Sequence, residues 1–397
     1  MASRATGHLE RTSVAGAPVS YFVPLPLPPT EPALRIDGVL AARLDAAERA
    51  LGRLALAAEL AAPYRWVARA LLREEAVRSA QIEGGQATLF DVYAAEAAAE
   101  ADTGRRADPD VEEVCHAVVA ASHAHDELRS AHGRPLSLRL LHETQALLVP
   151  ARGARASAPD PFSGDTAGAA HPRQLDPGPR PPRALAELLD AFERYLQAEP
   201  ELPPLVRAGL LALQLETIHP YRDGNARMAR LLVPLLLQGW ALLGSPLLCL
   251  SRFFQREREA YYGRAAAVRT DGDWEGWLEL FLGGVATAAH EGSATVRDVL
   301  ALVARDRERL FAEHAPPLLA LRLFEALPDA PVCTIASAVR RLDTTKPAAG
   351  RAVDLLVRAG VLVETTGRKH GRTFAYRALV EALTGAGEPT ARPRPPR

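Results

Sequence analysis

Cysteine and lysine are scarce in this sequence of 397 residues, and so is net charge. Its three cysteines, Cys115, Cys249 and Cys333, are odd in number and far apart, which excludes a CxxC motif and a disulfide framework. Lys346 and Lys369 are the only lysines, so nearly every basic residue is an arginine. The formal net charge of -1 excludes a general attraction of the whole chain to nucleic acid or to anionic membranes.

A signal peptide and an uninterrupted membrane span are also missing. The N-terminal sequence MASRATGHLERTSV contains no apolar core of the kind that signal peptides need. Residues 231–250 carry no charge and are long enough to cross a bilayer, but Pro234 and the Gly-Ser-Pro sequence at 244–246 interrupt them. We therefore expect a buried helix and a short second piece, in a cytoplasmic protein that has no membrane contact.

Helical periodicity dominates the rest of the sequence. Alternating prolines in YFVPLPLPP, residues 21–29, instead predict an extended N-terminal arm. Residues 150–183 are rich in proline, glycine and aspartate, which predicts a long loop or flap. Apolar residues recur at helical spacing over 36–60, 64–79, 108–132, 138–148, 184–197, 205–218, 273–292 and 296–313.

The C-terminal segment changes character. A helix, a short helix, a turn and a third helix are followed by two β-like runs with a basic turn between them, an order typical of a winged helix-turn-helix. Residues 316–397 carry 13 basic and 7 acidic residues, a net charge of +6. Arg368, Lys369 and Arg372 in the predicted wing are therefore candidate contacts to DNA phosphates. A winged helix that serves only packing or dimerisation is the alternative.

The residues that could bind a ligand or take part in a reaction are concentrated in HPYRDGNARMAR, residues 219–230. Apolar runs on both sides predict that the core holds this connection rigidly. Asp223, Gly224 and Asn225 predict a turn that ends at a helix N-terminus, whose free amides and partial positive charge suit a phosphate. Arg227 and Arg230 lie three residues apart, so they share a helix face and can bracket one anion.

Two further residues complete a predicted nucleotide polyphosphate site. Asp223 at its edge can hold a magnesium ion that bridges phosphates. His219 can take a proton from an incoming hydroxyl group. Each residue alone has a simpler reading as part of a turn, a helix end or a solvated face. The combination of six such residues at their fixed spacing would arise by chance in only about one chain of this length in a hundred thousand.

The stretch resembles the signature of the Fic family, HPFx(D/E)GNGRxxR. The proline-rich arm and residues 250–285 are similar to the corresponding parts of long Fic proteins. SAQIEGGQATLFDV, residues 79–92, resembles the family's inhibitory motif (S/T)xxxE(G/N), with Ser79, Glu83 and Gly84 at its fixed positions. A C-terminal winged helix is a frequent appendage in this family.

The resemblance implies an autoinhibited protein adenylyltransferase, which transfers AMP from ATP to a Ser, Thr or Tyr hydroxyl of a target protein with the help of Mg²⁺. It makes His219 the general base and Asp223 the magnesium ligand. Tyr262 is expected near the adenine, and Glu83 is expected to pair with Arg230 in the place of a phosphate. The expected phosphate-binding residues are Gly224, Asn225, Ala226, Arg227 and Arg230.

Two departures from the family pattern lead to an alternative function. Ala226 replaces the second glycine of the signature, and a positive φ there would cost alanine about 1 kcal/mol. Residues 154–176 lack the tryptophan and the strand pattern of the family's target-docking flap. The alternative is a catalytically weak or inactive nucleotide-binding transcription regulator, and transfer of a phosphate or removal of AMP stay open as well.

The predicted fold class is mainly α, a Fic-type helical bundle core with a short flap and a C-terminal winged helix-turn-helix. We place an N-terminal arm and helices at 1–105, the core at 106–315, the winged helix at 316–380 and a tail at 381–397. The expected partners are a target protein and, through the winged helix, DNA. Self-association is left open.

Overall fold

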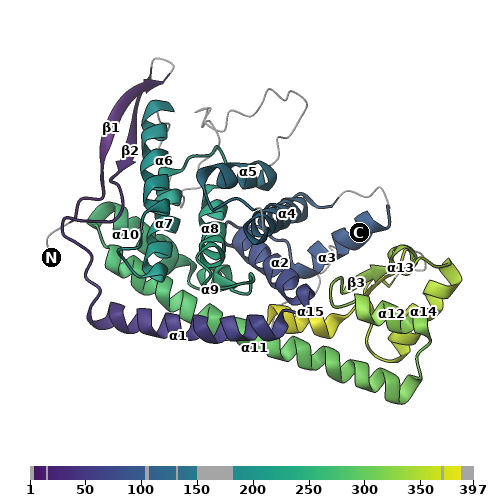
Figure 1. Ribbon diagram of the computed structural model, residues 1–397. Coiled ribbons are helices and arrows are strands. Elements are labelled where there is room, and N and C mark those ends of the chain that lie inside the picture. Colours follow the sequence, from purple (N-terminus) through teal and green to yellow (C-terminus); the bar gives the residue numbers. More distant parts are fainter. Residues whose placement is uncertain are drawn as a thin grey trace. The chain divides into compact units, whose positions relative to one another are not determined.

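Figure 1 shows the computed structural model, which describes residues 4–14, 17–102, 107–130, 133–149, 182–367 and 371–385. Helices dominate these described residues, which confirms the mainly α fold class. The chain divides into two compact units. Unit 1 consists of residues 1–56 and 116–290, and unit 2 of residues 57–115 and 291–397.

Unit 1 is built around two helices that carry the motif between them. Its elements, three of which continue into unit 2, are β1 (Gly7–Val14), β2 (Ala17–Pro24), α1 (Gly38–Ala61), α4 (Pro109–Arg129), α5 (Leu138–Leu148), α6 (Pro182–Gln197), α7 (Pro204–Ile218), α8 (Asn225–Gly239), α9 (Leu250–Arg256), α10 (Arg258–Asp271) and α11 (Trp274–His314). Helix α7 packs against α8, α6 and β2.

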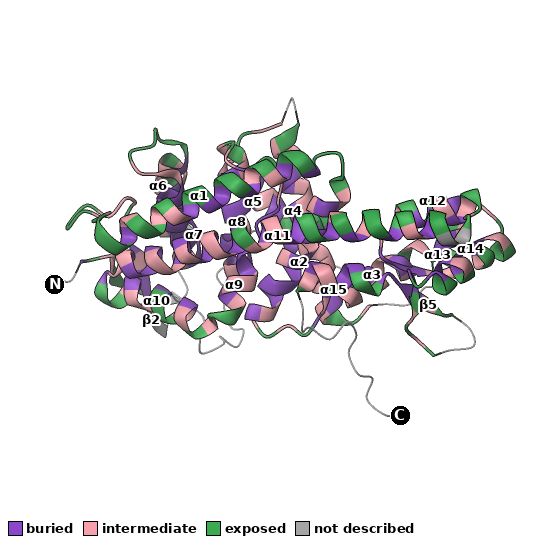
Figure 2. Ribbon diagram, turned by 90° about the horizontal axis from the view of Figure 1, so that it is seen from below, coloured by how far each residue is buried: buried purple, intermediate pink, exposed green. Residues whose placement is uncertain are grey.

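Helix α7 is buried along nearly its whole length, as its mostly apolar sequence requires. Figure 2, seen from below, marks the buried residues of the helices in purple. Gly209 allows a close approach to α11, because a Cβ there would lie 2.9 Å from side-chain atoms of Leu278 and Phe281. The indole of Trp277 also donates a hydrogen bond to the Gly209 carbonyl at 2.9 Å. This packing holds α7 in place, and with it the start of the motif.

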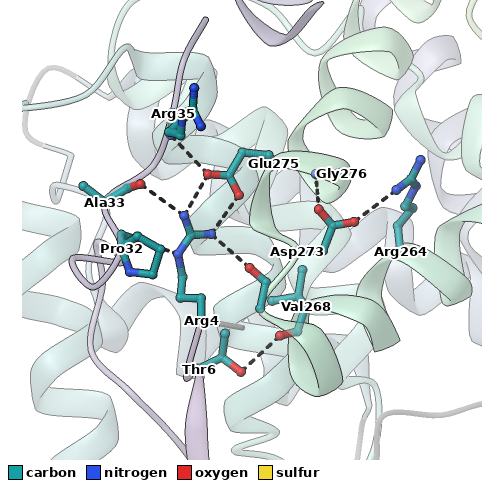
Figure 3. Close-up of polar contacts among 11 residues, drawn as sticks. Arg4, Thr6, Pro32, Ala33, Arg35, Arg264, Val268, Asp273, Glu275 and Gly276 are labelled. Atoms are coloured by element: carbon teal, nitrogen blue, oxygen red, sulfur yellow. Dashed lines mark hydrogen bonds and ion pairs between the residues drawn. The ribbon is translucent and has the colours of Figure 1, made fainter. Parts of the chain in front are cut away.

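The N-terminal arm is anchored by a buried arginine (Figure 3). Arg4 donates five hydrogen bonds, two of them to the carboxylate oxygens of Glu275 at 2.8 Å. The other three go to the carbonyls of Pro32, Ala33 and Gly272. The arm is extended as predicted, and β1 and β2 in addition pair as an antiparallel hairpin, which the proline pattern did not reveal.

Unit 2 combines helices from both halves of the chain with a small sheet. Arg341 ties α13 to α3 by an ion pair with Glu100 at 2.7 Å. Its further elements are α2 (Arg65–Ile82), α3 (Leu89–Glu100), α12 (Leu318–Ala326), β3 (Val332–Thr334), α13 (Ile335–Leu342), α14 (Lys346–Arg358), β4 (Val363–Glu364), β5 (Thr373–Ala375) and α15 (Arg377–Thr384). The sheet is antiparallel, with strand order β3-β5-β4.

From α12 to β5 the elements follow the order predicted for a winged helix, with the added strand β3. The winged-helix assignment itself stays a prediction, because it rests on this order. Helix α15 contacts α2 and α3 in the same unit. Arg78 of α2 donates to the Thr384 carbonyl at 3.3 Å, so the helix with the proposed inhibitory motif is tied to the C-terminal elements.

One expectation about helix continuity differs from the structure. The helices expected at 273–292 and 296–313 form one helix, α11, since Gly292 costs a helix only about 1 kcal/mol and no proline follows until its end. The domain boundaries expected after residues 105 and 315 stay predictions, and the two compact units divide the chain at other positions. Helices α1, α4 and α11 continue through the division, so the interruptions in sequence pattern do not mark it.

The uncharged run at 231–250 breaks as predicted. Helix α8 ends at Gly239 and the next helix begins at Leu250. Among the described residues, no helix is both long and apolar enough to cross a membrane.

Candidate active site

The site begins where α7 ends. His219 follows the last residue of the helix in a left-handed conformation, with φ 53° and ψ 56°. Its amide donates to the Leu215 carbonyl at 3.0 Å and closes the final helical turn. Histidine tolerates this conformation better than most residues. The sharp change of direction places the half-buried imidazole at the start of the connecting loop.

Asn225 gives the loop its shape. Its side-chain oxygen accepts from the Tyr221 amide at 2.8 Å, and its side-chain nitrogen donates to the Tyr221 carbonyl at 2.6 Å. Both groups are buried, and Asn225 is the only asparagine in the chain. The structure therefore places this predicted phosphate ligand with its amide side chain inside the loop, so its backbone N–H is the group left for a phosphate.

Gly224 is required at the bend that follows. Its φ of 75° is left-handed, and a Cβ there would lie 3.0 Å from Val149 and 3.3 Å from Leu148. Gln145 of α5 fixes the same bend by donating to the Asp223 carbonyl at 2.6 Å. No side chain caps the helix that starts here, so its first amides point out of the helix toward any anion at this end.

Arg227 and Arg230 are both buried, with 6% and 4% exposure. One nitrogen of Arg227 donates to the Asp223 carboxylate at 3.3 Å. Both side chains have partners, yet Nε and Nη1 of Arg227 and Nη1 of Arg230 are shielded from solvent and donate to no residue that the structure describes. Buried donors of this kind are costly, and the oxygens of an anion would satisfy them.

Asp223 is the candidate metal ligand. Its side chain is 66% exposed, and one oxygen accepts from the Gly224 amide at 2.6 Å. Within the described ranges, no group of three or more His, Cys, Asp or Glu residues could hold a metal. One carboxylate with phosphate and water oxygens is a common magnesium environment, so Asp223 fits Mg²⁺ that arrives with a nucleotide.

Ala226 lies in the first turn of α8. It is helical, so the backbone strain considered for this position does not arise. Alanine is in fact the better helix former, and the exchange of glycine for alanine stabilises a helix. The departure from the family signature therefore leaves the backbone of the turn intact.

Two aromatic pairs flank the motif. Tyr221 shares a hydrogen bond of 3.0 Å with His142, and burial lowers the pKa of this histidine, which favours its neutral form. Tyr262 is half-buried on α10, with its ring centroid 5.2 Å from that of Tyr261 and 6.0 Å from the guanidinium carbon of Arg258. Its expected place beside an adenine stays a prediction.

Three polar residues around the motif were missed in the sequence: Gln145, Glu216 and Tyr261. Tyr261 is fully buried and donates to Glu216 at 2.7 Å. Glu216 stands three residues before the motif histidine and is the only charged residue within 208–218, which was a usable signal. No local pattern pointed to Gln145 or Tyr261.

The inhibitory residues lie in unit 2. Ser79 is buried in α2, Glu83 caps the C-terminal end of this helix, and Gly84 follows with φ 102°. A carboxylate is unfavourable at a helix C-terminus, so a cation beside Glu83 would stabilise it. Arg230 belongs to unit 1, and its pairing with Glu83 stays a prediction.

The predicted wing and flap are only partly described. Arg372 is exposed, with its guanidinium carbon 5.3 Å from the centroid of the Phe374 ring. Arg368, Lys369 and the flap at 154–176 lie outside the described residues.

Comparisons with known proteins agree with the resemblance in the motif. The sequence model of the Fic/DOC family matches residues 135–237, and the model of the Fic/DOC family N-terminal region matches residues 41–126. These two matches support the assignment of residues 41–126 and 135–237 to the Fic/DOC family.

Solved structures of similar proteins include three with low sequence identity. A Fic family protein from Desulfovibrio desulfuricans G20 is 18% identical, with a TM-score of 0.49, over 90% of this chain and 99% of that one. A fragment of Fic-1 from C. elegans is 18% identical, with a TM-score of 0.43, over 67% and 74%. A Fic domain containing signaling protein from Bacteroides thetaiotaomicron VPI-5482 is 17% identical, with a TM-score of 0.44, over 63% and 98%.

Proposed function

We propose that this protein is an adenylyltransferase inhibited by its own Glu83 carboxylate, which transfers AMP from ATP to a Ser, Thr or Tyr hydroxyl of a target protein. The observation that carries the proposal is the loop between α7 and α8. It joins a half-buried histidine at one end to an uncapped helix N-terminus with two buried arginines at the other. A proton acceptor and an anion site within twelve residues suit transfer of a phosphate-containing group to a hydroxyl.

In the proposed reaction, the imidazole of His219 takes the proton of the target hydroxyl. The hydroxyl oxygen attacks the α-phosphorus of ATP, the bond from this phosphorus to the β-phosphate oxygen breaks, and pyrophosphate leaves. The first amides of α8 with Arg227 and Arg230 bind the phosphate oxygens and stabilise the charge that develops on them. Magnesium bound at Asp223 would neutralise part of the polyphosphate charge.

The test is an incubation with Mg²⁺ and ATP labelled either at the α-phosphate or at the γ-phosphate. The Glu83→Gly variant is the starting enzyme, because the proposed function includes inhibition by this carboxylate. We expect protein-bound label only from the α-position, more of it in Glu83→Gly than in the wild type. His219→Ala in the Glu83→Gly background should remove it.

Each other outcome has a distinct meaning. Label from the γ-position would indicate phosphate transfer instead. Equal labelling of wild type and Glu83→Gly would contradict the inhibitory role of Glu83. ATP binding without any transfer in Glu83→Gly would favour the second candidate, a nucleotide-binding regulator.

The second candidate is favoured by the C-terminal elements of unit 2. Their element order is the one predicted for a winged helix, and α2, with the proposed inhibitory motif, is tied to them through Arg78 and Thr384. A regulator of this kind would bind duplex DNA more weakly as salt increases. Titration of the full chain with a random duplex at low and moderate salt, with and without ATP, measures this directly.

A further inference from the structure

Three helices of unit 1 bring polar side chains to one small cavity. Glu216 comes from α7, Arg230 from α8 and Tyr261 from α10. The cavity has a volume of about 10 Å³, near the smallest space that can hold one water molecule, and its other walls are apolar. Phe254 and Trp277 are among these walls.

The three polar groups lie deep in the protein. Glu216 and Arg230 are each 4% exposed and Tyr261 is 2% exposed. A carboxylate buried to this extent needs compensation by hydrogen bonds or by an opposite charge. The Tyr261 hydroxyl supplies one such bond, at 2.7 Å from Oε2 of Glu216.

The phenol of Tyr261 connects the carboxylate with the arginine. Burial raises the pKa of Tyr261 well above its usual value, and the charge of Glu216 raises it further. Arg230 acts in the opposite direction, both by its charge and by a hydrogen bond to the phenol. Tyr261 therefore stays protonated and lies within reach of both partners.

Aromatic packing fixes the position of the phenol. The ring of Tyr261 lies 4.7 Å from that of Phe254 and 5.7 Å from that of Trp277, measured between centroids. Trp277 is itself held by its hydrogen bond to Gly209. A ring held on several sides directs its hydroxyl to one point, which is a condition for orienting a charged partner.

We infer that Glu216 and Tyr261 are positioning residues that orient the guanidinium of Arg230 toward the polyphosphate, an inference that rests on the proposed function. Tyr261 occupies one oxygen of Glu216 and fixes the plane of the carboxylate. The Tyr261–Glu216 pair then restricts the arginine, whose long side chain otherwise has many rotamers. Arg230 is then ordered already when the protein folds. Nucleotide binding therefore loses less side-chain entropy at this residue.

Tyr376 offers a matched control. Its buried hydroxyl donates to Asp306 at 2.7 Å, the same distance as in the Tyr261–Glu216 pair, and both Tyr376 and Asp306 belong to unit 2. Phenylalanine at 261 or at 376 removes one hydroxyl and leaves the ring. The two variants share the loss of a buried hydrogen bond, and only one of them affects a neighbour of Arg230.

The first measurement is calorimetric binding of ATP, tripolyphosphate and AMP, each with Mg²⁺. In Tyr261→Phe we expect ATP and tripolyphosphate to bind about tenfold more weakly, the effect of losing roughly one hydrogen bond. AMP, which lacks the β- and γ-phosphates, should change by less than about twofold, well below the effect of one hydrogen bond. Tyr376→Phe should leave all three affinities unchanged.

A double-mutant cycle shows whether Tyr261 acts through Glu216. In the Glu216→Gln background, Tyr261→Phe should change ATP affinity by less than about twofold, since coupled residues are not additive. Equal losses for AMP and ATP in Tyr261→Phe, or a full tenfold effect in the Glu216→Gln background, would overturn the inference.

A nucleotide-free readout separates this inference from the proposed function. The Nε–H signal of Arg230 in ¹⁵N NMR spectra, assigned with Arg230→Met, should shift in Tyr261→Phe and in Glu216→Gln but not in Tyr376→Phe. An unchanged signal would overturn the positioning role. If the wild type binds neither ATP nor tripolyphosphate, the proposed function is wrong, and the spectra still decide whether Glu216 and Tyr261 orient Arg230.

Discussion

Arg4 and Arg230 are both buried arginines of unit 1, but the regions around them use the guanidinium group in different ways. All five N–H donors of Arg4 have acceptors within the protein, two on one carboxylate and three on backbone carbonyls (Figure 3). At Arg230, Nη1 is buried and donates to no described residue, and the side chain stands in the first turns of an uncapped helix.

The difference separates an arginine that stabilises the fold from one that we propose to bind a phosphate. Arg4 donates all its hydrogen bonds to groups far away in the sequence. It therefore stabilises the fold and has no donor left for a ligand. Arg230 has partners within the protein, but its Nη1 donates to no described residue, in a place where a helix N-terminus favours an anion. The role of a buried arginine therefore depends less on its burial than on whether its N–H donors have acceptors within the protein.

The largest expected effect is on stability, from Arg4→Met. Removing the guanidinium leaves Glu275 and three carbonyls without this partner, which should lower the free energy of unfolding by about 3 kcal/mol. Urea unfolding followed by tryptophan fluorescence reports on unit 1, since it contains Trp240, Trp274 and Trp277 of the four tryptophans.

Arg35→Met is the control for this variant. Arg35 pairs with Asp37 at the surface with 71% exposure, so its loss should cost less than about 0.5 kcal/mol. ATP affinity should stay within about twofold of the wild type in both variants, since neither side chain makes the charge-assisted bonds to a phosphate that the site requires. A loss of ATP binding in Arg4→Met without unfolding would break the distinction between the two arginines.

Arg230→Met should show the opposite profile. ATP should bind about thirtyfold more weakly, because a charge-assisted hydrogen bond contributes about 2 kcal/mol. The free energy of unfolding should fall less than in Arg4→Met. Arg4 is the partner of one carboxylate and three carbonyls, whereas the Glu216 carboxylate near Arg230 keeps its hydrogen bond from Tyr261. Calorimetry with ATP and the same urea titration measure both quantities, and unchanged ATP affinity would remove Arg230 from the site.

Ala226→Gly tests whether the alanine in the first turn of α8, beside these arginines, affects stability and activity. Since Ala226 is helical, glycine should lower the free energy of unfolding by about 0.5–1 kcal/mol and should not raise the activity of the Glu83→Gly enzyme. Thermal unfolding and the α-label assay check the two parts. A large gain in transfer with the family's glycine would mean that the alanine methyl obstructs the phosphates.

The smallest expected effect is on the pH dependence of the free energy of unfolding. Burial alone would raise the pKa of Glu275, but hydrogen bonds from Arg4 and the Arg35 amide outweigh it, and the pKa lies below its usual value of 4.5. A lowered pKa means that the stabilisation is present above about pH 4.5 and is lost as the pH falls through the folded-state value.

The measurement compares wild type with Glu275→Gln. The difference between their urea midpoints should be largest near pH 7 and should shrink below pH 4.5. A difference that is constant across this range would mean that the Arg4–Glu275 pair contributes through packing and not through charge.

Much of the candidate site could be predicted because it is local in sequence. The turn at Gly224, the start of α8 and the common face of Arg227 and Arg230 depend on residues within one short segment. The helices expected at 138–148 and 205–218 agree with α5 and α7 within one residue at each end. Continuity of α11 was missed, since a single glycine looks like an end in sequence but costs a long helix little.

The sequence by itself determined the helical class, the motif loop and the placement of His219, Gly224 and the two arginines along it. Only the tertiary structure decided that Asn225 turns its side chain inward, that Arg4 meets Glu275 across 271 positions, and that Tyr261 meets Glu216 across 45. The physical reason is the sequence distance between the residues that determine each feature. Turns and helix ends follow from the φ and ψ preferences of adjacent residues, whereas a buried hydrogen bond between distant residues depends on how whole helices pack, which no short pattern encodes.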